Sequence, residues 1–302
     1  MNRPAFAFLL VTILSGATSI AQQPTPIEIE TQPVATGVYM LIGDGGNIGV
    51  TIGQDGVAII DDQYDRMSEK IRAAIGKLTG QPVSFVINTH WHGDHTGGNE
   101  AFGRTGSVIV AHDNVRRRMS VESVNAFTGD TNAAAPREAL PIVTFDQAVT
   151  LHYNDDELEV VHVANAHTDG DAVIHFRQAN VVHMGDVFFN GFYPFIDNNS
   201  GGTLAGMVAA ADTVLARIDD RTRVIPGHGP LANKQDLQAY RDMLATVHER
   251  VSKLVAAGKS QDEVLAAKPT ADFDARWGSG FFKPDVWVGR VYVELKRATQ
   301  PQ

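Results

Sequence analysis

The decisive stretch of this chain is THWHGDHTGGN, residues 89–99, which places His90, His92, Asp94 and His95 within six positions. Shuffled chains of the same composition would contain the pattern H-x-H-x-D-H about once in a thousand tries. His90 and His92 point the same way in an extended chain because side chains alternate from one face to the other. A turn at Gly93 then brings the aspartate and the third histidine to a neighbouring position. One loop can therefore supply ligands to two adjacent metal ions.

The chain contains no cysteine, and this restricts the metals that it can hold. Any ion must be bound by imidazole and carboxylate groups alone, which favours zinc, iron, manganese or cobalt over thiolate-dependent sites. Without disulfides, stability must come from burial, and hydrophobic residues make up 43% of the chain. A chain of this size and composition can build an ample core.

The first 21 residues have the features of a signal peptide. A positive charge at Arg3 precedes an apolar run over 5–14, and small residues at 19 and 21 frame a cleavage site. About 10 apolar residues are too few to cross a bilayer, which needs roughly 20. We therefore expect a periplasmic or secreted protein without a stable membrane anchor. Its mature form, residues 22–302, is predicted to be a single domain in which 227–302 is partly a C-terminal helical extension.

The net charge of the chain is −10, and removal of Arg3 makes it −11. The three arginines at 116–118 form the one basic cluster in the sequence, and we interpret them as a solvated face of a helix. An acidic protein of this kind is unsuited to a nucleic-acid backbone. The composition thus favours a small-molecule partner and leaves the oligomeric state open.

Short apolar runs between glycine turns predict strands over 38–42, 48–52, 57–60, 83–87, 142–145, 148–153, 158–163, 172–176, 181–184 and 223–225. Helical spacing of apolar residues predicts helices over 65–78, 114–121, 204–218 and 237–254. Residues 122–140 show no period and are expected to form a surface loop, and the tail from 260 is helical and aromatic. Two halves of this kind would pack sheet against sheet with helices outside.

Three further candidate ligands lie in glycine-containing loops beside strands: His167 in AHTDGD, Asp186 in HMGDVFF and His228 in IPGHGP. Glycine gives such loops the freedom to aim a side chain. Asp61 follows a strand and is interpreted as a structural partner of the metal loop. Asp169 and Asp171 are interpreted as turn or capping residues. The other histidines are expected to be surface or packed residues, namely His112, His152, His162, His175, His183 and His248.

The order H-x-H-x-D-H, H-T-x-G-D, G-D and G-H-G resembles that of the metallo-β-lactamase superfamily of binuclear hydrolases, over residues 34–254. The resemblance implies an α+β, four-layer αβ/βα sandwich with metals at one edge of its two sheets. It also implies two Zn²⁺ ions, with iron or manganese as alternatives. By position, one ion would be held by His90, His92 and His167, the second by Asp94, His95 and His228, and Asp186 would bridge them.

The same resemblance suggests the reaction. Metals in such sites activate water for attack on a carbonyl, and Asp94 would orient that water and pass its proton to the leaving group. INTHWHGDHTGGNEAFGRTG, residues 87–106, fits the first signature of zinc-dependent β-lactamases. In their best-known group, however, a cysteine ligand and a nearby lysine occupy the region of Asp186. An aspartate there is similar to thioesterases of the glyoxalase II type and to lactonases.

We therefore expect an exported zinc hydrolase that opens a cyclic amide or ester, with a β-lactam as the leading substrate. Lactone or thioester hydrolysis is the nearest alternative. A mononuclear iron enzyme similar to persulfide dioxygenases is a further alternative, which the predicted export disfavours. The loops over 43–47 and 122–136 are expected to flank the substrate, and Asn190, Tyr193 and Asn198 either contact it or belong to a packed aromatic segment.

Overall fold

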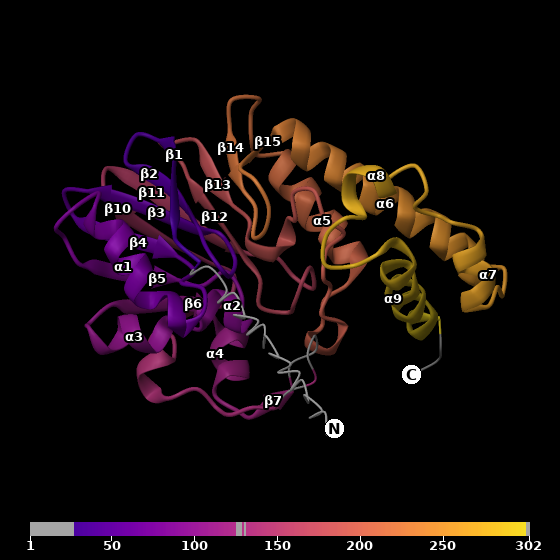
Figure 1. The fold of residues 1–302 in the computed structure, drawn as a ribbon, viewed down its shortest axis with the longest axis horizontal. Coiled ribbons are helices and arrows are strands. Elements are labelled where there is room, and N and C mark those ends of the chain that lie inside the picture. The colour runs from indigo at the N-terminus through magenta and orange to yellow at the C-terminus, as the bar shows by residue number, and fades with distance from the viewer. Residues whose placement is uncertain (1–26, 125–128, 130, 300–302) are drawn as a thin grey trace, which may run out of the picture.

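A computed structural model describes residues 27–124, 129 and 131–299, so the predicted signal peptide lies outside the described residues. Two sheets face each other in the described part, and helices cover their outer faces (Figure 1). The first sheet has the order β1 (Glu30–Ala35), β2 (Val38–Ile42), β3 (Ile48–Gly53), β4 (Gly56–Ile60), β5 (Val83–Ile87), β6 (Val108–His112) and β9 (Val143–Phe145). The second has the order β10 (Ala148–Tyr153), β11 (Asp156–His162), β12 (Ala172–Phe176), β13 (Val181–His183), β14 (Arg223–Ile225) and β15 (Ala232–Asn233).

The alternation of side chains along the strands creates the layers. In β4, Ala58 and Ile60 point into the core between the sheets, where they meet residues of the second sheet such as Ile174. Val57 and Ile59 point the other way and pack on the first helical layer. Because a strand presents successive residues to opposite faces, an unbroken apolar run such as 57–60 predicts a strand that is covered on both sides. The four layers are thus helix, sheet, sheet and helix.

Helices on each outer face complete the cores. The first sheet is covered by α1 (Ser68–Gly76) and α3 (Asn99–Arg104), through buried residues of both helices. The second sheet is covered by α5 (Leu204–Leu215) and α6 (Lys234–Ala256). Beyond them lie α7 (Gln261–Ala266), α8 (Asp274–Trp277) and α9 (Pro284–Ala298), at the far end of the molecule from the first sheet (Figure 1). Among the described residues, no helix combines the length and apolarity that a membrane crossing requires.

The predicted elements are largely confirmed, and the strands over 38–42, 83–87, 148–153, 172–176 and 223–225 have the predicted bounds. The structure adds β1, β6 and β15, which the sequence analysis did not predict, and the short helices α2 (Gly93–Thr96) and α3. The expected helix over 114–121 is α4 (Asp113–Met119). In the region expected to be a loop, the short strands β7 (Ser123–Val124) and β8 (Thr131–Asn132) pair with each other, while 125–128 and 130 lie outside the described residues.

The site lies where the carboxyl ends of several strands meet. In the first sheet β4, β5, β6 and β9 run parallel, so Asp61 after β4 and the 89–99 stretch after β5 emerge at the same edge. In the second sheet β13 and β14 are parallel and bring Asp186 and His228 to a common edge. Since loops at the carboxyl ends of parallel strands gather at one edge, residues far apart in sequence become neighbours there.

Candidate metal centre

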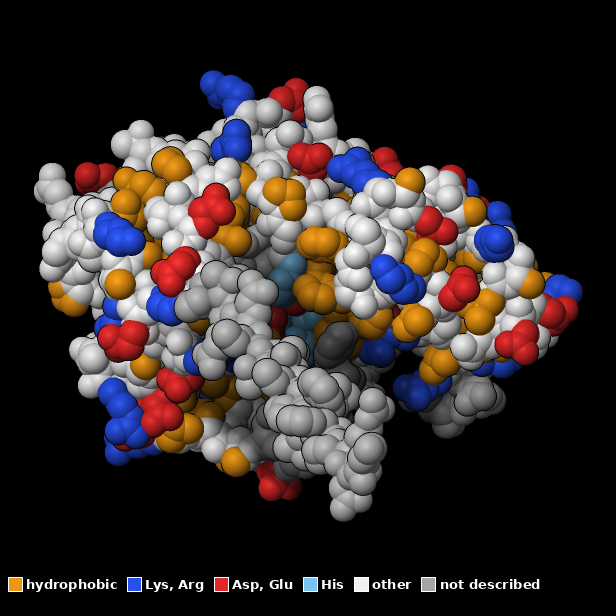
Figure 2. Space-filling view, viewed as in Figure 1, with side chains coloured by type: hydrophobic (Ala, Val, Ile, Leu, Met, Phe, Trp, Pro, Cys, Tyr) orange, Lys and Arg blue, Asp and Glu red, His pale blue; other side chains and the backbone are white. Residues whose placement is uncertain are grey.

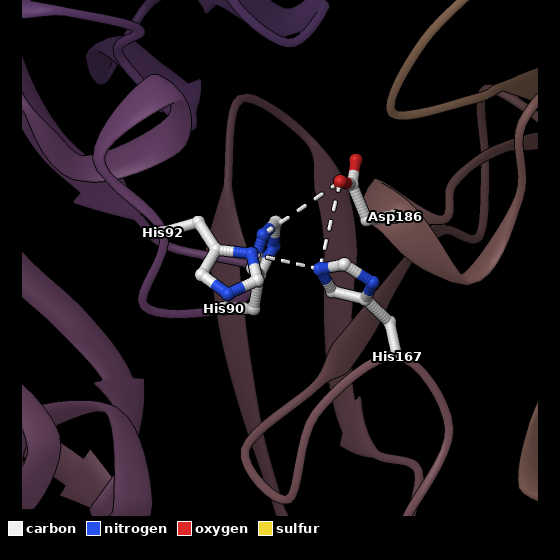
Figure 3. Close-up of side chains that lie close together, drawn as sticks. All are labelled: His90, His92, His167 and Asp186. Atoms are coloured by element: carbon white, nitrogen blue, oxygen red, sulfur yellow. Dashed lines mark hydrogen bonds and ion pairs between the residues drawn. The ribbon is translucent and has the colours of Figure 1, made fainter. Parts of the chain in front are cut away.

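The structure brings all seven predicted ligands together in two adjacent groups. The ligand atoms of the first group, His90, His92, His167 and Asp186, lie within 4.8 Å of one another (Figure 3). Those of the second group, Asp94, His95 and His228, are equally close to one another. We call these the first and second ligand groups. The six other residues fall into the two sets that the sequence analysis named, and Asp186, which was predicted to bridge the ions, falls with the first; the role of all seven as metal ligands stays a prediction.

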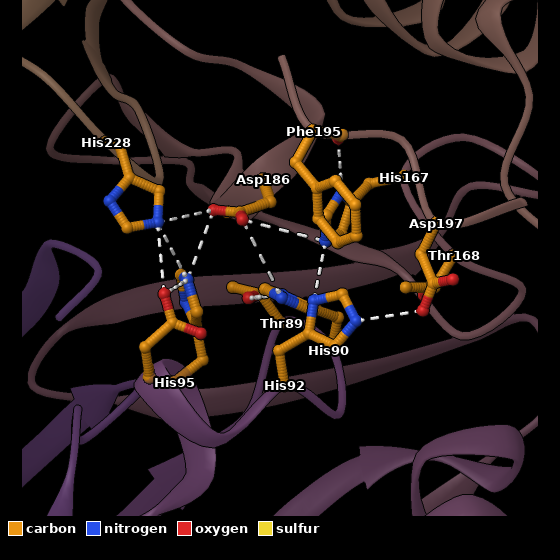
Figure 4. Close-up of polar contacts among 12 residues, drawn as sticks. Thr89, His90, His92, His95, His167, Thr168, Asp186, Phe195, Asp197 and His228 are labelled. Carbon is orange, nitrogen blue, oxygen red and sulfur yellow. Dashed lines mark hydrogen bonds and ion pairs between the residues drawn. The ribbon is translucent and has the colours of Figure 1, made fainter. Parts of the chain in front are cut away.

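The carboxylate of Asp186 lies between the two groups and offers one oxygen to each (Figure 4). Its Oδ2 is 3.6 Å from Nε2 of His167 and 3.9 Å from Nε2 of His90. Its Oδ1 is 3.1 Å from Nε2 of His95 and 3.4 Å from Nε2 of His228. Asp186 sits in a short 3-10 helix, Gly185–Val187, directly after β13. Asp186 could therefore contact an ion held by either set of histidines.

Hydrogen bonds on the outer side of the first group determine which ring nitrogens face inward. Nδ1 of His167 donates to the carbonyl oxygen of Phe195 at 2.8 Å, and Nε2 of His92 donates to Oδ2 of Asp197 at 3.0 Å. Nδ1 of His90 is 3.0 Å from the Thr89 hydroxyl. Partners of this kind fix the tautomer of a ligating imidazole, because the other nitrogen must then carry the free lone pair.

The second group is held by Asp61, which lies fully buried beyond the end of β4. Its Oδ2 accepts from Nδ1 of His95 at 2.8 Å and from the Thr89 hydroxyl at 2.7 Å. Its Oδ1 accepts from the Thr89 backbone N–H at 2.7 Å. Asp61 adopts a left-handed backbone conformation with φ 64°, which is uncommon for a residue other than glycine. The interpretation of Asp61 as a structural partner of the metal loop agrees with these contacts.

The electrostatics of the site suit a cation. Burial lowers the pKa of His90 well below its usual value and that of His167 to about 4, so both rings are neutral at neutral pH. Burial raises the pKa of Asp94, but the neighbouring His95 and His228 outweigh it and lower this pKa to about 2. Burial also lowers the pKa of His228, yet the carboxylates of Asp186 and Asp94 raise it to about 9. The same carboxylates would stabilise a metal ion.

Spacing and hydrogen bonding both indicate that metal ions fit here. Two ligand atoms about 2.1 Å from a tetrahedral zinc ion lie roughly 3.4 Å apart. Nε2 of His167 and Nδ1 of His92 are 2.9 Å apart, and Nε2 of His95 and Nε2 of His228 are 3.4 Å apart. Nε2 of His90 and Oδ1 of Asp186 are buried and have no hydrogen-bond partner among the described residues. Buried polar atoms are normally satisfied, and coordination to a metal would satisfy both.

The family of the chain follows from a comparison with known proteins. The family model described as Metallo-beta-lactamase superfamily matches residues 42–246, more than half of the chain. The chain belongs to the metallo-β-lactamase superfamily. The match contains all seven candidate ligands and ends within α6, so α7, α8 and α9 lie beyond it.

Relatives in this superfamily are named for different activities. A hydroxyacylglutathione hydrolase of Nitrosococcus oceani is 27% identical, over 79% of this chain and 84% of the relative. A metallo-beta-lactamase type 2 of Bacteroides fragilis is 21% identical, over 82% of this chain and 98% of the relative. The solved structure of a metallo-beta-lactamase from Pontibacter korlensis shares the fold, with a TM-score of 0.60, 21% identity, and 72% of this chain and 99% of the other covered. These relatives support a metal-dependent hydrolase that acts on small molecules.

Close approach of the backbone explains two glycines of this superfamily member. A Cβ at Gly46 would lie 2.1 Å from Cε1 of the His95 ring, and one at Gly227 would lie 2.1 Å from Oδ1 of Asp186. The predicted substrate loop over 43–47 therefore packs against the metal loop, and the Gly46 N–H donates to the Asp94 carbonyl at 3.0 Å. Any side chain at either glycine would displace a ligand.

The six remaining histidines lie outside both ligand groups. His112 and His162 stack on each other with centroids 3.8 Å apart, and His183 bonds the Asn47 carbonyl. Of the three polar residues considered as substrate contacts, Asn190 donates to the Pro230 carbonyl and Tyr193 is buried and donates to Asp274. The third, Asn198, bonds Gly202 and Glu294. These contacts favour the alternative of a segment packed for stability.

Two residues beside the ligands, Asp197 and Phe281, were not predicted from the sequence. Asp197 directly follows the apolar, largely aromatic stretch 192–196. A single carboxylate next to such a stretch could have indicated a residue that orients a ligand. Phe281, from the C-terminal extension, is 54% exposed although its ring is edge-on to His228, with centroids 5.3 Å apart. Figure 2 shows histidine side chains within a hollow that has hydrophobic side chains along one side.

Proposed function

We propose that this chain is an exported two-zinc hydrolase that opens a cyclic amide or ester, with a β-lactam as the leading substrate. Export is supported by the signal-peptide features of residues 1–21. Zinc is supported by a donor set of imidazoles and carboxylates without thiolate. The β-lactam is supported by the β-lactamase-like motif at 87–106 and by the Bacteroides fragilis relative.

The observation that carries the proposal is the pair of ligand groups with Asp186 between them. Two bound ions would supply a water activated at neutral pH and a Lewis acid for the substrate carbonyl. The inward nitrogens of the five histidines would hold the ions, and outer hydrogen bonds would keep four of these rings aimed, those of His90, His92, His95 and His167. Asp186 would keep the two ions at a fixed separation.

Asp94 is placed to move a proton. Its Oδ2 is 3.3 Å from Nε2 of His228 and 3.6 Å from Nε2 of His95, and its side chain is 25% exposed. A carboxylate in this place, beside the ligands and open to the solvent, can accept a proton from the attacking water. The same oxygen can then give that proton to the leaving group, because the residue lies at the border between the ligands and the solvent.

The exposed Phe281 supplies an apolar contact for the substrate. Its ring lies edge-on to His228 and 5.7 Å, between centroids, from the ring of Phe192. An exposed aromatic ring beside a ligand can bind an apolar group of a substrate whose scissile bond reaches the ligands. The proposed substrate thus carries an apolar substituent near the bond that is broken.

A second candidate is hydrolysis of a thioester or lactone, and Asp186 favours it. Its carboxylate stands where the resemblance to the best-known β-lactamases would require a cysteine ligand. The hydroxyacylglutathione hydrolase of Nitrosococcus oceani is also more similar in sequence to this chain, at 27% identity, than the Bacteroides fragilis enzyme is, at 21%. This candidate uses the same ligands and the same proton acceptor.

The test combines metal analysis of the purified protein with hydrolysis of matched β-lactams, lactones and thioesters. The leading proposal predicts two zinc ions per chain and the highest kcat/KM on a β-lactam. The highest kcat/KM on a thioester or lactone would establish the second candidate instead. One iron ion per chain without hydrolysis would contradict both hydrolase candidates and would favour a mononuclear iron enzyme that oxidises a persulfide. In an Asp186→Cys variant, an unchanged order of substrates would show that the bridging carboxylate does not set the bond preference.

A further inference from the structure

The outer support of the first ligand group comes from one short segment, residues 193–198, which we call the bracing segment. The Phe195 carbonyl accepts from the ring of His167, and the Asp197 carboxylate accepts from the ring of His92 (Figure 4). The backbone N–H of Asp197 also donates to the carbonyl oxygen of His167 at 3.0 Å. Two of the three histidines in this group are therefore held by the same six residues.

The bracing segment is in turn fixed by Trp287 of α9. The indole Nε1 donates to the Pro194 carbonyl at 2.9 Å. Its ring also stacks on Tyr193, with centroids 4.4 Å apart and planes at 12°. Trp287 and Tyr193 are both almost completely buried. A rigid aromatic pair with a buried hydrogen bond holds the backbone on the N-terminal side of Phe195.

Glu294, two turns further along α9, fixes the other end of the segment. Its carboxylate accepts from Nδ2 of Asn198 at 3.0 Å and from the backbone N–H of Leu204 at 2.8 Å. Arg290 lies between Trp287 and Glu294 along α9, and its guanidinium is 5.0 Å from the centroid of the Phe195 ring. Residues 287, 290 and 294 share one face of the helix because they are three and four positions apart. One face of α9 thus contacts the segment along its length.

We propose that α9 is a positioning element for the first metal, which acts by fixing the bracing segment and through it the rings of His92 and His167. This inference rests on the two-metal site of the proposed function and extends that site to a helix beyond the family match. Groups that orient metal ligands typically change metal affinity about 10-fold to 100-fold when they are altered. The second ligand group has its own support at Asp61, so loss of α9 contacts should affect one ion far more than the other.

Two background variants isolate the two ions. His228→Ala removes a ligand of the second group and leaves the first intact, whereas His92→Ala does the opposite. Zinc affinity is then measured in each background by competition with a chromophoric chelator, with no need for substrate. Glu294→Gln is introduced into both backgrounds, because an amide keeps the shape of the side chain but has one acceptor oxygen for two donors. Trp287→Phe, which keeps a stacked ring but loses the hydrogen bond, provides a second variant.

Both substitutions should raise the zinc Kd about 10-fold in the His228→Ala background and less than about 2-fold in the His92→Ala background. Asp285→Asn is the matched control, since it removes an acidic charge from an exposed position of the same helix and should leave both values unchanged. An unchanged Kd in the His228→Ala background would overturn the inference. Equal weakening in both backgrounds, with a lower Tm, would also overturn it, because α9 would then support the fold in general. Absence of zinc binding in both unmodified backgrounds would instead contradict the two-metal site itself.

Discussion

The two ligand groups are held by different parts of the molecule. His95 of the second group is hydrogen-bonded to Asp61 at the buried end of the first sheet. His92 and His167 of the first group are hydrogen-bonded to the bracing segment, which α9 contacts. Asp61, which holds His95, is fully buried and accepts three hydrogen bonds within the region of the family match. Asp197, which holds His92, lies in a segment that depends on α9, beyond that match. Similar ligands can therefore be supported either by the core of the fold or by a helix that lies beyond the family match.

The largest losses of activity should come from substitution of a metal ligand or of the proton acceptor. Comparing the two substitutions separates loss of metal binding from loss of the chemical step. We expect His90→Ala to lose the first metal and turnover together, because His90 supplies an inward nitrogen of the first group. Asp94→Ala should lower kcat at least about 100-fold, as expected for loss of a proton acceptor, with a modest loss of metal. Metal content and kcat are measured on the same preparations. Parental activity in both variants would exclude a catalytic site here.

Asp61→Asn should selectively weaken the second metal. The amide cannot accept all three hydrogen bonds and lacks the charge that orients His95, so zinc affinity of the second group should fall about 10-fold to 100-fold. Affinity is measured in the His92→Ala background. Asp62→Asn is a matched control at the neighbouring buried carboxylate, whose Oδ1 accepts from the Gly98 N–H and not from the His95 ring. An equal loss in the control would mean that packing, and not the contact with His95, is responsible.

Asp197→Asn is the mirror-image variant for the first metal. It removes the charge that faces the outer nitrogen of His92, and we expect about a 10-fold loss of zinc affinity in the His228→Ala background. Asp169→Asn serves as the control, because Asp169 lies in a nearby loop and forms an ion pair with Arg118. If Asp197→Asn and Asp61→Asn weakened the same ion, the division into two independently supported groups would be wrong.

The smallest effect should come from Phe281→Ala. The variant removes an apolar contact from the hollow but no ligand, so KM should rise a few-fold while kcat and metal affinity stay close to the parental values. Val286→Ala is the control, since that side chain is 55% exposed on α9. Steady-state kinetics on the best substrate of the panel measures the effect. A fall in kcat with unchanged KM would contradict a role in substrate binding.

The sequence predicts the ligands well because each lies in a short motif beside a strand, where glycine and histidine or aspartate occur together. It does not predict the support of the first group, because His92 and Asp197 are 105 positions apart and α9 is further still. β1 contains Pro33 and polar residues, which obscured its pattern. Helices α2 and α3 contain glycines, which lower helix propensity.

The most direct test of two adjacent, separately supported metal sites is the zinc content of the purified protein and of its two background variants. The parent should hold two zinc ions per chain, and His228→Ala and His92→Ala should each hold one. Treatment with a chelator should remove these ions and lower Tm, and added zinc should restore both. If the parent held a single zinc ion and both variants lost it, the protein would not contain two separately supported metal sites.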